Sequence, residues 1–419
     1  MTHPMKWANA LSTQPSLEAA LAEVIDRAQQ QLQSTADMGL IFISSAFASE
    51  YSRLMPLLKE RLSVPVLIGC GGVGVAGMNP QGLPEEVEEN PALSLTLAHL
   101  PDVKLHAFHI STDELPDLDS SPDAWVKLVG VSPQEQPQFI LLAAPFASGL
   151  NDFLQGLDFA YPGAVKVGGL ATTESISGSS GLFCNYQRYQ DGIVGIALSG
   201  NVVLEAIVAQ GCRPIGCPYR VTQGEKNILL GLEVQANLGE TACDADASQT
   251  QTPLEALQDL FQTLDESDRK LAQHSLFIGV AQSEFKQNLE HGDFLIRNLI
   301  GIDPKLGAIA IGDRIRPGQR IQFHLRDAQA SAKDLEMLLE RYRKQAEANS
   351  TAAAGALIFT CMGRGEELYN QPNFDSELFC RYVEHIPLGG FFCGGEIGPI
   401  ENTTFLHGFT SVFGICRQP

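Results

Sequence analysis

The chain has 419 residues, 44% hydrophobic and 18% charged, a composition typical of a globular protein with room for two or three domains. Its 49 acidic residues outnumber 28 basic ones, and the net charge of −21 argues against nucleic acid or anionic lipid as a partner. The sequence contains neither an apolar run long enough for a membrane span nor a secretory leader. We therefore expect a cytoplasmic protein.

Helix and strand patterns alternate from the N-terminus onward. Apolar residues at helical spacing predict a helix over 16–35, and apolar runs predict buried strands at 39–44 and 64–70. A helix is expected between those strands, over 51–62. The segments SLTLAHL and VKLHAFHI follow and are predicted to form a strand pair.

The same order of elements recurs about a hundred residues later and again at the C-terminus. FILLAAPF matches LIFISSAF, VKVGGLATTE matches VLIGCGGVG, and GIVGIALSG takes the place of SLTLAHL. The third copy consists of ALIFTCMGRG, a predicted helix over 375–385, LGGFFCGGEIG and TSVFGICR. Because parallel neighbours need a helical crossover and tight turns give antiparallel ones, the repeat predicts an α/β (α+β) fold. We expect mixed sheets flanked by helices, built from strand-helix-strand-strand units.

A polar, acidic run, LGETACDADASQTQT, is the best candidate for a domain junction. Directly after it, Thr252, Pro253 and Glu255 form a capping box with proline at the first helical position. After this helix, short strands are predicted in LFIGVAQ, FLIRNLIGI, GAIAIG and RIQFHLR. The sequence thus predicts an N-terminal helix packing on the first domain (1–36), an internally duplicated first domain (37–238), a linker (239–252) and a second domain (253–419).

The sequence contains no convincing motif for a dinucleotide site, a metal site or a serine hydrolase. Gly69, Gly71 and Gly74 have the spacing of a dinucleotide loop, but the following residues contain three prolines and no helix to receive a pyrophosphate. His106 and His109 lie in a predicted strand, where side chains three apart face opposite sides. No nucleophile elbow of the G-x-S-x-G type is present. We expect no cofactor and no metal.

Polar groups follow the ends of two predicted strands near the C-terminus. Cys361 and Arg364 come after one strand, and Cys393, Gly395 and Glu396 come after the next. If the strands are neighbours, both turns open on one rim, where α/β sheets commonly bind ligands. Arginine is suited to a carboxylate and glutamate to an amine.

Two interpretations of this cluster remain open. Arg364 and Glu396 either hold a ligand or pair with each other to brace a turn. The cysteines either pack or react, because a thiol beside arginine is expected to have a lowered pKa.

Several segments resemble the FIST family from about residue 37 to the end. VLIGCGGVG, VKVGGLATTE, GIVGIALSGNV and AIVAQGCRPIGCPYRVT are similar to the FIST N-terminal domain. FLIRNLIGID, ALIFTCMGRG, PLGGFFCGGEIGP and FLHGFTSVFG are similar to its C-terminal partner. The resemblance implies a sensory module for small ligands such as amino acids, found in bacterial signalling proteins and eukaryotic F-box proteins. The motif positions are Arg213, Cys361, Arg364, Cys393, Glu396 and His407.

The leading hypothesis is a sensory protein that holds a small polar ligand between its two domains, with Arg213, Arg364 and Glu396 as anchors. Because the FIST-like region leaves no room for an output segment, we expect the signal to pass to a separate signalling protein.

An alternative is a cysteine-dependent enzyme acting on a small acyl or thiol-reactive substrate. Cys361 or Cys393 would be the nucleophile, and His407 would be the base within hydrogen-bond reach. A third hypothesis, an interaction scaffold, predicts a large exposed apolar patch.

Overall fold

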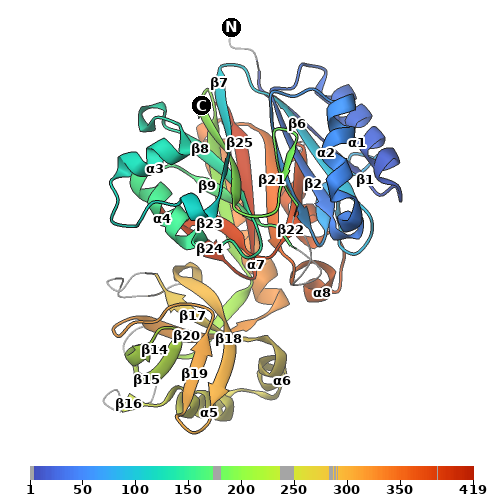
Figure 1. Cartoon of the computed structure of the whole chain (residues 1–419). Coiled ribbons are helices and arrows are strands. Elements are labelled where there is room, and N and C mark those ends of the chain that lie inside the picture. Colours follow the sequence, from blue (N-terminus) through green and yellow to red (C-terminus); the bar gives the residue numbers. More distant parts are fainter. Residues whose placement is uncertain are drawn as a thin grey trace. The chain divides into compact units, whose positions relative to one another are not determined.

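The computed structural model describes residues 4–172, 181–235, 250–282, 286, 289, 291–384 and 386–419 (Figure 1). The chain divides into two compact units, and the second, Gln210–Asp334, interrupts the first, Met1–Ala209 with Leu335–Pro419. The predicted ranges 37–238 and 253–419 follow chain order, whereas the compact units do not. Most of the predicted linker, 239–252, lies outside the described residues.

Three six-stranded sheets in the first unit share one plan. Each contains two parallel strands joined by a helical crossover. The parallel pairs are β2 (Met38–Ser44) with β3 (Val66–Gly72), β8 (Gln138–Ala143) with β9 (Lys166–Leu170), and β21 (Ala353–Cys361) with β22 (Leu388–Cys393). The crossover helices are α2 (Tyr51–Arg61), α4 (Leu150–Ala160), and α8 (Gly365–Tyr369) with α9 (Phe374–Tyr382).

Two further strands extend each sheet on the side of the first parallel strand. The inner ones are antiparallel, namely β6 (Leu93–His99), β12 (Ile193–Gly200) and β25 (Thr410–Arg417). The outer ones are β1 (Lys6–Ser12), β7 (Val103–Ile110) and β13 (Val203–Gln210). The mixed sheets confirm the predicted fold class and the predicted repeat.

A hairpin from a different repeat completes each sheet, which the sequence did not reveal. Hairpin β4 (Val75–Met78) with β5 (Pro84–Val87) follows β3 but pairs with β22. Hairpin β10 (Leu182–Cys184) with β11 (Gln187–Tyr189) follows β9 but pairs with β3. Hairpin β23 (Glu396–Ile400) with β24 (Thr403–His407) follows β22 but pairs with β9. The three repeats therefore exchange hairpins in a cycle.

One glycine per repeat fixes which residues are equivalent. It lies in the second parallel strand, opposite a residue whose carbonyl oxygen would be within 2.0 Å of an added Cβ. The pairs are Gly69 with Ile41 (2.0 Å), Gly168 with Leu141 (1.7 Å) and Gly390 with Ile358 (1.8 Å). Because no Cβ fits at such a distance, glycine at this position is required by the close approach of the two backbones.

The residue after each of these glycines pairs with the first residue of an incoming hairpin. Cys70 pairs with Leu182, Gly169 with Glu396, and Phe391 with Val75. Leu182, Glu396 and Val75 are thus equivalent positions.

One face of each sheet is directed to a common core, and helices cover the other face. Phe42 and Phe391, from different sheets, stack in the common core with ring centroids 5.0 Å apart. Helices α1 (Leu17–Leu32) and α2 cover the first sheet, and α3 (Pro122–Val129) and α4 cover the second (Figure 1). Helix α7 (Ala328–Asn349) and α9 pack on the third.

The second unit is an antiparallel sheet that closes on itself. Its order is β14 (Cys212–Glu225), β20 (Arg320–Arg326), β17 (Leu276–Ala281), β18 (Phe294–Asp303), β19 (Ala308–Ile311), β15 (Ile228–Val234) and β16 (Thr250–Gln251), and β14 also pairs with β15. Helices α5 (Pro253–Thr263) and α6 (Glu266–Ser275) belong to this unit, and Thr252 and Glu255 form the predicted capping box. Across the described residues, no helix is both long and apolar enough to cross a membrane.

Candidate functional site

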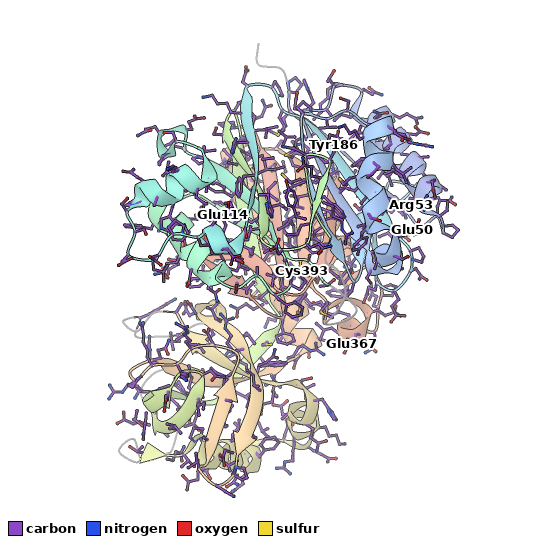
Figure 2. All side chains as sticks on the ribbon, in the orientation of Figure 1. Glu50, Arg53, Glu114, Tyr186, Glu367 and Cys393 are labelled. Atoms are coloured by element: carbon purple, nitrogen blue, oxygen red, sulfur yellow. The ribbon has the colours of Figure 1, made fainter. Side chains whose placement is uncertain are left out.

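The two C-terminal turns lie side by side, as the sequence analysis required. Strands β21 and β22 are parallel neighbours, and Cys361 is the register partner of Cys393. Cys393 lies among the strands of the first unit (Figure 2). The turns that carry Arg364 and Glu396 consequently leave the same edge of one sheet.

Arg364 is fully buried, with 0% exposure, and is held mainly by one carboxylate. Its Nε and Nη2 donate to the two oxygens of Asp375 in α9, at 2.7 and 2.9 Å, and Nη2 also donates to the Tyr369 hydroxyl. Thr360 donates a further hydrogen bond to Asp375 at 3.1 Å. Arg364 therefore braces α9 through Asp375 rather than through Glu396. Its Nη1 is buried and has no hydrogen-bond partner among the described residues.

Glu396 is also fully buried, at 0% exposure, and only one of its two carboxyl oxygens is occupied. Oε2 accepts hydrogen bonds from the Thr410 amide at 3.1 Å and the Thr410 hydroxyl at 2.7 Å. Burial raises the pKa of Glu396 to about 8, against the opposing effects of Thr410, the Arg364 charge and the neighbouring Cys361 thiol. Oε1 is buried and finds no partner in the described part of the chain.

The thiols of this cluster are not activated. Burial raises the pKa of Cys361 to about 12 and that of Cys393 well above its ordinary value, and the Glu396 carboxyl raises both further. The expectation of a lowered pKa beside Arg364 is wrong for Cys361, because desolvation outweighs the arginine charge. These environments argue against either thiol as a nucleophile.

Among the cysteines of the described residues, one is not a free thiol. Cys70, Cys184, Cys212, Cys361, Cys380, Cys393 and Cys416 are free, but Cys217 is disulfide-bonded.

His407 and Gly395 have structural contacts of their own. His407 is buried, is the register partner of Glu396, and has Nε2 3.0 Å from the Gly398 carbonyl oxygen. Gly395 accepts a hydrogen bond from the Leu170 amide at 2.8 Å and so joins two repeats. Both residues frame the Glu396 position through the backbone.

Arg213 belongs to the second unit, whereas the other predicted site residues belong to the first. Its Nε donates to Asp327 at 3.0 Å, and its Nη2 forms an ion pair with Asp268. Two carboxylates thus neutralise this guanidinium within its own unit.

The repeat shows which residues of the site are unusual. Glu396 occupies the position of Val75 and Leu182, which are fully buried apolar residues. Arg364 lies six residues after Ile358, which faces the glycine of its repeat. The residues six positions after the equivalent Ile41 and Leu141 are Phe47 and Ala147. Only the third copy therefore places a carboxylate and a guanidinium where the other copies place apolar groups. Because burying such groups costs free energy, these two residues make the third repeat the candidate for a functional site.

The first unit consists of three α/β repeats that exchange hairpins, and its third repeat contains the buried polar cluster. A closed antiparallel sheet is inserted into the chain of that third repeat. Models of the FIST N domain and the FIST C domain match residues 37–235 and 253–399. The chain belongs to the FIST family. FIST domains are sensory domains, which fits a sensory role.

Relatives extend this match over nearly the whole chain. An uncharacterized protein of Mycobacterium bovis is 30% identical over 401 residues, 95% of each chain. One from Mycobacterium tuberculosis is 30% identical over 403 residues, 96% of this chain and 97% of its own. An F-box/LRR-repeat protein of Arabidopsis thaliana is 29% identical over 117 residues, covering 24% of this chain and 22% of its own.

Proposed function

We propose that the protein is a sensor whose small polar ligand binds at Arg364 and Glu396 in the third repeat. One observation carries the proposal: Nη1 of Arg364 and Oε1 of Glu396 are both fully buried and lack protein partners among the described residues. Unsatisfied buried polar atoms are rare because each costs about 1 to 3 kcal/mol. A bound molecule that supplies both partners removes this cost.

The chemistry of the two free atoms defines the ligand class. Nη1 of Arg364 is a cationic donor suited to a carboxylate, and Oε1 of Glu396 becomes an acceptor for an ammonium group when the carboxyl group gives up its proton on binding. The Arg364 charge lowers the pKa of Glu396, so the two groups act on one another within one site. A molecule that carries both a carboxylate and an amine, such as an amino acid, satisfies both.

This proposal differs in two respects from the hypothesis based on the sequence. Arg213 is left out of the anchor set, because Asp268 and Asp327 already bind its guanidinium. The proposed site is built from Arg364 and Glu396, which both belong to the first unit. The signal passes to a separate signalling protein that recognises the liganded form.

Isothermal titration against a panel of amino acids tests the proposal, together with native mass spectrometry for a co-purified molecule. Arg364→Lys and Glu396→Gln are suitable variants, because Arg364→Ala would leave the buried Asp375 carboxylate unpaired. We expect each to weaken binding by at least about tenfold, which corresponds to about 1.4 kcal/mol. Arg213→Gln is the control and leaves affinity unchanged. No binding by any panel member, or equal binding by both site variants, contradicts the proposal.

A further inference from the structure

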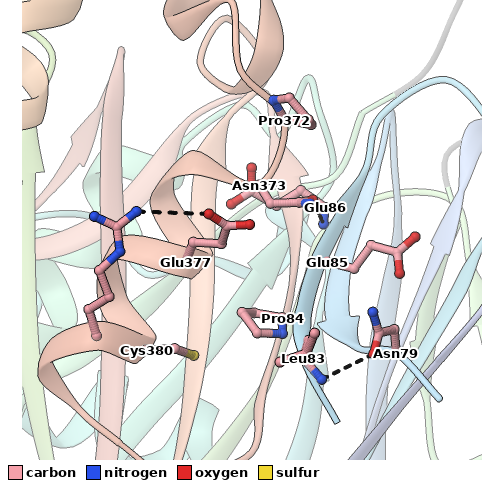
Figure 3. A pocket seen from close by; sticks show the side chains of 10 residues that line it. Asn79, Leu83, Pro84, Glu85, Glu86, Pro372, Asn373, Glu377 and Cys380 are labelled. Carbon is pink, nitrogen blue, oxygen red and sulfur yellow. Dashed lines mark hydrogen bonds and ion pairs between the residues drawn. The ribbon is translucent and has the colours of Figure 1, made fainter. Parts of the chain in front are cut away.

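A pocket of about 520 Å³ opens on the surface of the first unit (Figure 3). It lies between hairpin β4–β5, which the first repeat contributes to the third sheet, and the segment around α9. Its volume is within the range of about 300 to 1,000 Å³ that small-molecule sites occupy. The lining side chains with a distinct role are Leu83, Glu85, Glu86, Glu377 and Arg381.

Negative charge dominates this lining. Three glutamates face one cation, Arg381, which forms an ion pair with Glu377 at 3.9 Å. Glu85 and Glu377 lie on opposite sides of the pocket (Figure 3). Leu83, with 60% exposure, adds apolar surface beside the carboxylates. The pocket is thus suited to a cation that has an apolar portion.

Besides the charge of the pocket, the hydrogen bonding of Glu86 indicates that a donor is missing. It is only 8% exposed, and its Oε1 accepts a hydrogen bond from the Ser376 amide at 2.7 Å. Its Oε2 is buried and has no hydrogen-bond partner among the residues that the structure describes. A buried carboxyl oxygen of this kind calls for a donor, and Glu86 is one of the residues that line the pocket.

Elsewhere in the first unit, a buried ammonium group is the partner of a carboxylate between a crossover helix and a hairpin. Where α4 meets hairpin β23–β24, Asp158 accepts a hydrogen bond from the Thr404 amide at 2.7 Å. The buried ammonium of Lys166 neutralises Asp158 at 2.7 Å. In the third repeat the position of Lys166 is occupied by Leu388, two residues before the equivalent glycine. By the same registers Glu86 corresponds to Leu406 of the second repeat, so the second repeat has an apolar residue where the third sheet has this carboxylate.

We propose that this pocket binds a small organic cation whose primary ammonium group donates to Glu86 Oε2. Glu85 and Glu377 add attraction at the rim, and Leu83 contacts the carbon chain. The ligand class differs from that of the Arg364 and Glu396 site, and the inference does not depend on the function proposed for that site.

The protonation state of Glu86 provides a second measurable consequence of the proposal, namely proton release on binding. Burial and the neighbouring charge of Asp375 raise the pKa of Glu86 to about 8, so a bound ammonium that ionises Glu86 releases a proton near pH 7. The titratable groups that face Glu86 or line its pocket are Glu85, Glu88, Asp375, Glu377, Cys380 and Arg381.

The test is isothermal titration of the full chain with 1,4-diaminobutane at pH 7 and physiological salt, with 1,4-butanediol as the neutral probe. We expect the diamine to bind, the diol not to bind, and the heat to change with the ionisation enthalpy of the buffer. Glu86→Gln retains an acceptor for Ser376 and should weaken diamine binding at least tenfold. The exposed Glu401→Gln should leave it unchanged.

A second variant separates binding from folding. If Glu86→Gln lowers the melting temperature, Glu85→Gln at the rim should still weaken the diamine several-fold. Arg364→Lys and Glu396→Gln should bind the diamine normally, which distinguishes this site from the proposed sensor site. Equal affinity for diamine and diol, no diamine binding at millimolar concentration, or unchanged binding by both Glu86→Gln and Glu85→Gln would overturn the inference.

Discussion

Replacing Glu396 by glutamine should make the stability of the first unit less sensitive to pH. The pKa of Glu396 is raised from its ordinary value of 4.5 to about 8, so between these values the folded protein retains a proton that the unfolded chain releases. Unfolding therefore becomes easier as pH rises through this window, and the loss is complete above pH 8. Glutamine cannot ionise and keeps an oxygen for the Thr410 hydrogen bonds.

The magnitude follows from the size of the pKa change. Each tenfold change in proton affinity is worth about 1.4 kcal/mol, so a rise from 4.5 to about 8 corresponds to on the order of 5 kcal/mol. The difference in unfolding free energy between Glu396→Gln and the parent protein should be small near pH 4.5 and grow by this order up to pH 8. The ionisation of Glu86 changes the unfolding free energy of the variant and of the parent equally, so it does not affect the difference between them.

Tryptophan fluorescence provides a specific assay. The chain has two tryptophans, Trp7 and Trp125, and both belong to the first unit. Urea titrations followed at several pH values between 5 and 8.5 therefore report on that unit alone. Glu401→Gln, at an exposed position, serves as the control. A difference between variant and parent that stays constant over this range would refute the assigned environment of Glu396.

Three further predictions concern packing, a buried ion pair and a thiol. Gly390→Ala should destabilise the first unit by about 3 kcal/mol or more, since its Cβ would lie 1.8 Å from a carbonyl oxygen, whereas Gly394→Ala, whose nearest contact is 3.5 Å, should be tolerated in the same urea titration. Lys166→Met should cost about 3 to 5 kcal/mol by leaving Asp158 unpaired, and adding Asp158→Asn should recover much of it; additive losses would contradict the pairing. Cys361 should resist iodoacetamide at pH 8 in the folded protein and react after unfolding, as followed by peptide mass spectrometry; rapid labelling of the native chain would show an activated thiol.

The repeat could be predicted because each of its strands and helices has its own local sequence pattern. Apolar strands followed by glycine turns recur three times, and the helix expected over 375–385 corresponds to α9 at Phe374–Tyr382. The four strands predicted after Thr252 correspond to β17, β18, β19 and β20. Each of these elements is determined by its own apolar pattern and end signals.

The sequence does not show which strands pair with one another in a sheet. An apolar pattern indicates that a strand is buried but not which strand lies beside it, so neither the hairpin exchange nor the pairing of β14 with β20 could be inferred. Hairpin β4–β5 was missed for a second reason: Pro84 and its neighbouring prolines suggested irregular structure. Proline at the first position of β5 is compatible with a strand, because that position needs no ladder donor.

The site was predicted in part. The shared edge followed from the two glycine turns, but Asp375 as the partner of Arg364 lies on a helix face that the sequence did not distinguish. The buried states of Glu396 and Cys361 depend on hairpin β23–β24 crossing to another sheet. No local pattern encodes that crossing, so the raised pKa values could not be anticipated.

The cyclic exchange of hairpins affects how the protein emerges from the ribosome. Every strand of the first sheet has been synthesised once Tyr189 has been made, but the second and third sheets require strands located after residue 395. Hairpin β4–β5 has an edge without its final neighbour until β22 is made, and β9 has one until β23 is made, and such edges are prone to aggregate. The last tenth of the polypeptide consequently governs whether the earlier repeats are protected, so nascent chains stalled before β23 should require chaperones more than the finished protein does.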